Sequence, residues 1–148
     1  MSGIVGSVGA KSGIIGSTEI PGGYEEGIWT PEHTDITFSN AVGQYTKIGR
    51  VVMISGYVVV SSGGSHGSVF TNLPFTSGVY VYGAGGGNAI WDDMATYGSR
   101  HHAFCRVVEN TPTFHIVVND PSTGWSTIIN PSTGHKILFY FEYMVGGS

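Results

Sequence analysis

Short runs of β-branched and aromatic residues recur from Tyr24 to the end of the chain, and turn-forming residues separate them. The separators include SSGGSHG, GAGGGN, NDPSTG and NPSTG, in which Gly accepts positive φ and Pro presets the φ of a tight turn. The runs recur at intervals of roughly 10–15 residues, which is typical of antiparallel sandwiches and jelly rolls. The sequence therefore predicts an all-β fold, a jelly-roll-like antiparallel β-sandwich over residues 24–148.

The strongest strand candidate is Val51–Val60, in which eight of ten residues are apolar or aromatic around a Ser-Gly pair. PSTG occurs twice, at 121–124 and 131–134, so we expect a strand–turn–strand meander around residues 125–130. The remaining candidates are Ile36–Phe38, Tyr45–Ile48, Val69–Leu73, Val79–Tyr82, Ala103–Val108, Thr113–Val118, Ser126–Ile129 and Lys136–Val145.

Two of these strands, 51–60 and 136–145, carry apolar residues on both faces. Successive side chains of a strand point to opposite faces, and a strand with one solvated face usually alternates apolar with polar residues. A second apolar face predicts contact with another subunit, although a loop or the N-terminal segment could also cover it. The predicted oligomer interface consists of Val51, Met53, Tyr57, Val59, Leu138, Tyr140 and Met144.

Residues 1–23 form a separate, glycine-rich block that contains one motif twice, SGIVGS at 2–7 and SGIIGS at 12–17. Glycine at every third or fourth position weakens any helix, and Pro21-Gly22-Gly23 closes the block as a turn. We therefore expect an extended arm whose aliphatic side chains dock onto another surface. The docking residues are Ile4, Val5, Val8, Ile14, Ile15 and Ile20.

Composition and charge exclude several classes of partner. Only 11% of the residues are charged, the net charge is −4, and the six Lys and Arg are scattered. Nucleic acids and anionic membranes require clustered positive charge, so neither is expected as a partner. No apolar run is long enough to span a membrane, and no basic start resembles a secretion signal. The single Cys105 cannot form an intramolecular disulfide and reads as a small buried residue.

No catalytic constellation or cofactor motif is present. GSVGAKS at 6–12 lacks the glycines of a phosphate loop, and there is no G-x-S-x-G elbow. Asp92 and Asp93 are adjacent, whereas glycoside hydrolysis needs carboxylates that face each other across a cleft. The six His lack metal-ligand spacing, which leaves only a site shared around a three-fold axis. We therefore expect no enzyme activity, no cofactor and no metal.

Aromatic residues gather around the glycine-rich stretch 78–100, where they could stack on sugar rings or instead belong to the core. With the neighbouring polar residues they form a predicted recognition surface on the loops near 61–68 and 83–101. Its members are His66, Trp91, Asp92, Asp93, Tyr97, Arg100 and His101.

Three sequence elements in residues 24–75 resemble a module found at the C-terminal end of bacteriophage tail fibres and other virion proteins. They are YEEGIWTP, GQYTKIGRVVMISGYVVVSSGG and LPF. The matching residues are Glu25, Glu26, Gly27, Trp29, Thr30, Pro31, Gly43, Tyr45, Thr46, Lys47, Ile48, Gly49, Val52, Ile54, Gly56, Leu73, Pro74 and Phe75. The resemblance is loose over residues 76–148.

The resemblance implies a non-enzymatic β-sandwich in the virion, a homotrimer of a kind that is commonly receptor-binding. Two functions follow as expectations. One is a tail-fibre or receptor-binding module that contacts a host cell-surface glycan through the loops near 61–68 and 83–101. The alternative is a capsid decoration or other head-associated protein, which docks onto other virion proteins through residues 1–23. The short stretch before the module favours the alternative, whereas the resemblance and the aromatic loops favour the first.

Overall fold

The computed structural model describes residues 23–62, 66–67, 69–79, 84–91, 102–120, 124–126, 128–129 and 131–146. Within these residues every regular element is a β-strand, and no helix there could cross a membrane. The strands are β1 (Tyr24–Trp29), β2 (Glu32–His33), β3 (Thr37–Ile48), β4 (Val51–Ser62), β5 (His66–Gly67), β6 (Val69–Thr71), β7 (Gly85–Trp91), β8 (His102–Val107), β9 (Phe114–Asp120), β10 (Gly124–Ser126), β11 (Ile128–Ile129) and β12 (Lys136–Met144).

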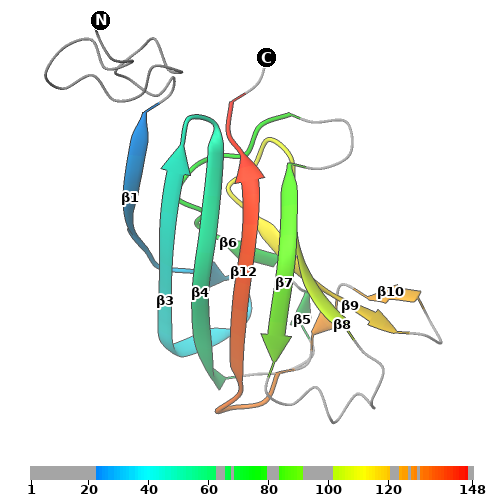
Figure 1. Ribbon diagram of the computed structural model, residues 1–148. Coiled ribbons are helices and arrows are strands. Elements are labelled where there is room, and N and C mark those ends of the chain that lie inside the picture. The colour runs from blue at the N-terminus through cyan, green and yellow to red at the C-terminus, as the bar shows by residue number, and fades with distance from the viewer. Residues whose placement is uncertain are drawn as a thin grey trace, which may run out of the picture.

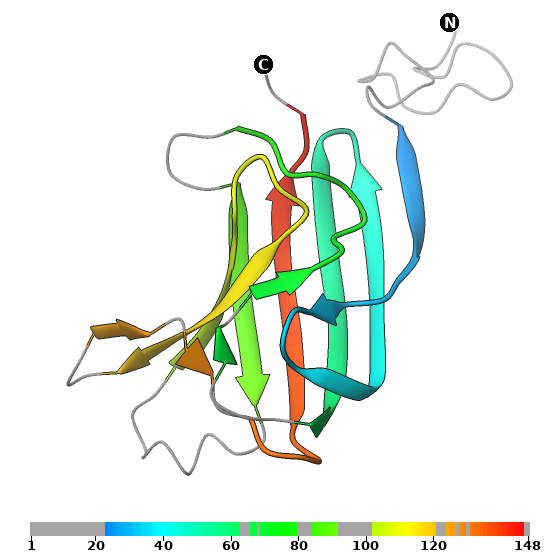
Figure 2. The same ribbon diagram turned by 180° about the vertical axis from the view of Figure 1, so that it is seen from behind.

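One antiparallel sheet contains most of the strands, in the order β1-β3-β4-β12-β7-β8-β9-β6-β2 (Figure 1). β10 extends from β9, and β11 pairs with β5 in a separate two-stranded sheet. Five neighbouring strands, β1, β3, β4, β12 and β7, form the front wall. The sheet then curls through β8 and β9 until β6 and β2 lie behind the front wall as a rear wall (Figure 2). The predicted all-β antiparallel class is confirmed. The predicted sandwich or jelly roll is not confirmed, because the strands of both walls belong to one sheet whose pairing is continuous.

Two strand predictions are corrected by the pairing. Ile36–Phe38 and Tyr45–Ile48 are not two short strands, since β3 runs unbroken through Ser39–Gln44 and pairs with β4 along its length. The predicted strand–turn–strand meander around residues 125–130 is wrong in its second half. β10 does form a hairpin with β9, but β11 leaves that path and pairs with β5.

The stretch GAGGGN was predicted to be a turn, and most of it is instead the start of β7, between β12 and β8. Its glycines permit a close approach between neighbouring strands. A Cβ at Gly85 would lie 2.1 Å from the carbonyl oxygen of Glu142, and one at Gly87 would lie 2.2 Å from that of Tyr140. Any larger residue would push β7 away from β12, so these glycines serve strand packing rather than a turn.

The core between the two walls is dominated by aromatic rings. Phe70, on the rear wall, stacks on Phe114 with 4.9 Å between ring centroids, and Phe114 contacts Phe141 at 4.7 Å. Phe139 lies 5.4 Å from Phe114, and the Trp29 ring packs against both of these side chains. These contacts join β12 to the curled-over strands and position the front wall.

Buried polar groups attach the segment after β6 to the open end of the core. The Tyr143 hydroxyl donates to the carbonyl oxygen of Phe75 at 3.0 Å, and burial raises the pKa of this tyrosine. The Ser77 hydroxyl donates to the carbonyl oxygen of Val108 at 2.5 Å and accepts the N–H of Thr111. Because these hydroxyls are paired, their burial avoids the penalty of an unsatisfied polar group.

The close approach of β7 to β12 predicts a strong effect of adding one methyl group. Gly87→Ala should lower the free energy of unfolding by about 1–3 kcal/mol, because the new Cβ overlaps backbone atoms that cannot move aside easily. Asn88→Ala, at the next and exposed position, should change it by less than about 0.5 kcal/mol. Urea unfolding followed by tryptophan fluorescence compares the two, and equal stabilities would contradict this packing.

Candidate functional site

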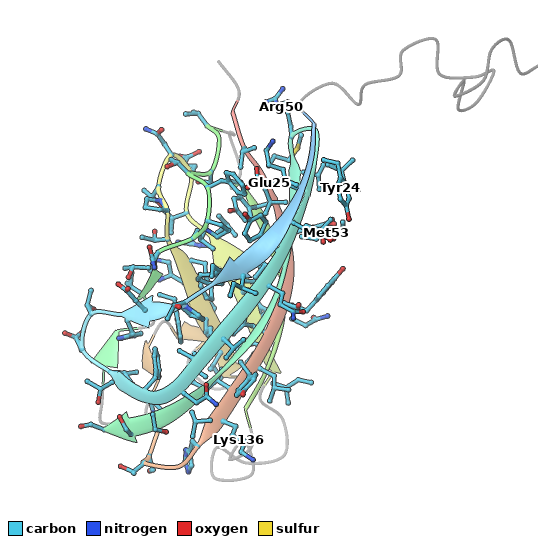
Figure 3. The ribbon with its side chains drawn as sticks, turned by 90° about the vertical axis from the view of Figure 1, so that its left-hand side faces the viewer. Tyr24, Glu25, Arg50, Met53 and Lys136 are labelled. Carbon is cyan, nitrogen blue, oxygen red and sulfur yellow. The ribbon has the colours of Figure 1, made fainter. Side chains whose placement is uncertain are left out.

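The outward face of the front wall is rich in exposed apolar side chains. Along β12, buried and exposed residues alternate without exception, with Phe139 and Phe141 inside and Leu138 and Tyr140 outside. Figure 3 views the wall edge-on and shows Tyr24 of β1 projecting from its outer side. Such a patch on one face of a sheet is typical of an interaction surface.

Strand register aligns four of these side chains in one row across the sheet. Val42 pairs with Tyr57, Tyr57 with Leu138, and Leu138 with Ile90. Their exposed fractions are 39%, 37%, 46% and 64%, respectively. No polar side chain interrupts the row across these four strands, so water meets a continuous apolar strip.

The adjacent row is mostly polar. Ile28 pairs with Gln44, Gln44 with Ser55, Ser55 with Tyr140, and Tyr140 with Asn88. Within the described part of the chain, the side chains of Gln44, Ser55 and Asn88 form no hydrogen bond to another residue. Two amides and a hydroxyl therefore remain available to a ligand or partner.

Three hollows follow this row and adjoin one another. The first, of about 420 Å³, lies over β1 and β3 and includes Ile28 and Gln44. The second, of about 290 Å³, also includes Gln44 and extends to Ser55 and Leu138. The third, of about 310 Å³, shares Ser55 and Leu138 and reaches Asn88. We call the three together the transverse groove, lined by Glu26, Gly27, Ile28, Val42, Gln44, Tyr45, Thr46, Ser55, Gly56, Tyr57, Asn88, Ile90, Leu138, Phe139 and Tyr140.

The groove exists because small residues lie between large ones. Ser55 and Gly56 occupy the middle of β4, whereas Tyr57 follows them in the same strand and Tyr140 lies beside Ser55. A Cβ on Gly56 would lie 2.6 Å from the Phe139 ring, so the ring fills the space beneath the glycine. The Asn40 amide donates to the Tyr57 hydroxyl at 2.9 Å, which holds that exposed ring in place.

Negative charge lies along the other side of the groove. Glu26 pairs with Thr46, and Glu142 pairs with Met53 in the next row of the same face. The Tyr24 hydroxyl donates to the Glu26 carboxylate at 2.7 Å, and this hydrogen bond raises the pKa of Tyr24. A partner with a positive charge near its apolar segment therefore suits this surface.

The described residues show no metal-binding cluster and no reactive thiol at this face. In the ranges that the structure describes, no cluster of three or more His, Cys, Asp or Glu residues could hold a metal ion. Cys105 is buried, and burial raises the pKa of its thiol to about 12, so the nucleophilic thiolate does not form at neutral pH. The groove offers apolar walls and amide hydrogen bonds.

The predicted outer-face residues lie where the strand alternation placed them. Tyr57, Leu138, Tyr140 and Met144 are exposed, and Val51, Met53 and Val59 are partly exposed. Sequence reasoning missed Ile28, Val42 and Ile90, and with them the polar row. β1 and β7 were not recognised as strands, although the aromatic and β-branched residues in YEEGIW and in the run Asn88–Trp91 carried a weak signal for both.

The remaining predicted residues fall largely outside the described part of the chain. The backbones of His66 and Trp91 lie in β5 and β7, so Trp91 ends a strand rather than lying in a glycine-rich loop. The other recognition residues and all six docking residues of the arm are outside the described residues. They are Asp92, Asp93, Tyr97, Arg100, His101, Ile4, Val5, Val8, Ile14, Ile15 and Ile20.

Comparison of the sequence with protein-family models gave no match, and comparisons with curated proteins and with solved structures gave no significant match.

A half-buried histidine on β9 predicts how stability depends on pH. Burial, with a smaller contribution from Arg106, lowers the pKa of His115 below its ordinary value. The unfolded chain therefore takes up the proton at a higher pH than the folded chain, and stability falls as the pH drops through the ordinary histidine range. The melting temperature should fall between about pH 7.5 and about pH 5.5. His115→Gln should reduce that fall, and an undiminished fall would contradict this assignment.

Proposed function

We propose that this chain is a non-enzymatic structural protein of a bacteriophage virion, a module of the tail-fibre type that assembles as a homotrimer. The observation that carries the assembly part is the apolar row Val42–Tyr57–Leu138–Ile90 on the outer face. The resemblance of residues 24–75 to virion modules supports the virion part.

Exposure of the apolar row to water is unfavourable in free energy. A large apolar side chain gains about 1.5–3 kcal/mol when it moves from full exposure to full burial. The four side chains of the row are 37–64% exposed, so a partner that covers them gains the corresponding fraction from every strand it crosses. The low charge content of the chain favours the same interpretation, because few charged groups must be desolvated when copies associate. Most soluble oligomers are symmetric assemblies of identical chains, which supports a homo-oligomer here.

Within the virion, we propose that the chain is a receptor-binding module that contacts a glycan on the host cell surface. The segment from Trp91 to His101 provides the aromatic, acidic and basic residues suited to sugar recognition. A capsid decoration or other head-associated protein, docked through residues 1–23, is the second candidate. It is favoured by the aliphatic repeats of that segment.

Charge placed on the outer face should disrupt the oligomer. Met53→Asp and Tyr57→Asp should each lower the mass in solution to that of one chain, because a carboxylate would be buried in the interface. Val79→Asp is the matched control, since Val79 is an exposed apolar residue outside the named strands. Multi-angle light scattering supplies the masses and circular dichroism verifies folding. Folded variants that keep the wild-type mass would refute this interface.

The position of the chain in the virion separates the two functions. Gold-labelled antibody on intact particles, viewed by electron microscopy, should mark the tail or fibre tips. Gold over the head would instead support the decoration protein, and particles without gold would contradict a virion role altogether.

A further inference from the structure

We propose that the transverse groove of one copy binds the second N-terminal repeat, SGIIGS at 12–17, of a neighbouring copy, laid across the strands between two outer faces. The inference rests on the proposed assembly through the outer face. It adds that the arm, and not only the facing sheet, fills the interface.

The length of the groove matches the length of one repeat. The groove crosses from β1 to β7, which is four inter-strand spacings or roughly 19 Å. A six-residue extended segment spans about 20 Å, so one repeat fits from end to end. The 22 residues before Gly23 can span more than about 70 Å when extended, which is enough to reach an adjacent copy.

The side chains of the repeat suit the groove. Serine and glycine at both ends are small enough for the backbone to approach the sheet closely, and the central aliphatic residue meets the wall formed by Leu138 and Tyr57. The free amides of Gln44 and Asn88 can each donate to and accept from the backbone of an extended segment, whose own peptide groups need partners.

The adjacent pairs Ile4-Val5 and Ile14-Ile15 indicate two surfaces rather than one. Neighbouring side chains of an extended segment point in opposite directions, so a groove on one side buries only one member of each pair. A second outer face on the opposite side buries the other member. A segment folded back onto its own sheet, with water above it, would leave one aliphatic side chain of each pair exposed.

Lys11 gives this repeat one partner for the negative charge beside the groove. Residues 1–22 contain one Lys and one acidic residue, Lys11 directly before the second repeat and Glu19 two residues after it. Glu26 and Glu142 lie one row from the polar row of the groove, so a repeat bound there has acceptors for Lys11 nearby.

Disulfide trapping tests this arrangement in the full chain. The double variant Ile15→Cys/Ser55→Cys places one thiol in the arm and one in the groove, while the native Cys105 is buried and unreactive. On a non-reducing gel, mild oxidation should convert it into covalent dimers and trimers at least ten times more efficiently than either single variant. Ile15→Cys/Glu32→Cys is the control, because Glu32 is exposed on β2, away from the groove.

The other outcomes overturn the inference in distinguishable ways. Loss of free thiols without a gain in mass would mean that the arm occupies the groove of its own chain. An oligomer in solution that gives no more cross-linked product than the controls would leave the proposed assembly intact and exclude this repeat from the groove. A wild-type chain that is monomeric in solution would refute the proposed assembly and this inference together.

Discussion

The central strand β12 has to support two apolar surfaces at once, and most of the structure follows from that constraint. Its inward rings, Phe139 and Phe141, contact Phe114 on the curled-over part of the sheet. Its outward residues, Leu138 and Tyr140, lie in the two rows that define the transverse groove. A partner on the proposed outer-face interface would therefore rest on a strand that the aromatic core packs from the other side, and binding would need little rearrangement of the sheet.

The same constraint explains the positions of several glycines. β12 is bracketed by β4 and β7, and on both sides glycine lets bulky groups or backbone approach. Gly56 leaves room for the Phe139 ring, while Gly85 and Gly87 leave room for the backbone of β12 itself. Replacing these glycines would separate the strands and disturb the core and the groove together.

The recurrence of β-branched and aromatic runs between turn-forming residues was sufficient to predict the all-β class, and the two-residue period of Val51–Val60 and Lys136–Val145 predicted which residues share a face. The path of the sheet was not predictable in this way, because strand order depends on contacts between distant residues that no local pattern encodes. β7 was missed because Gly85–Gly87 read as a turn, although their role is to approach β12. Because β1 and β7 were not predicted as strands, the predicted apolar face ended at β12 with Leu138. The polar row from Gln44 to Asn88 could not be predicted either, since Asn88 belongs to β7.

A homotrimer joined through the outer face is the central claim, and the mass of the unmodified chain in solution tests it most directly. Sedimentation velocity over a range of concentrations should give one species of three times the 15.6 kDa chain mass. A single species of 15.6 kDa across the same range would show that the apolar row of Val42, Tyr57, Leu138 and Ile90 stays in contact with water, which contradicts the account.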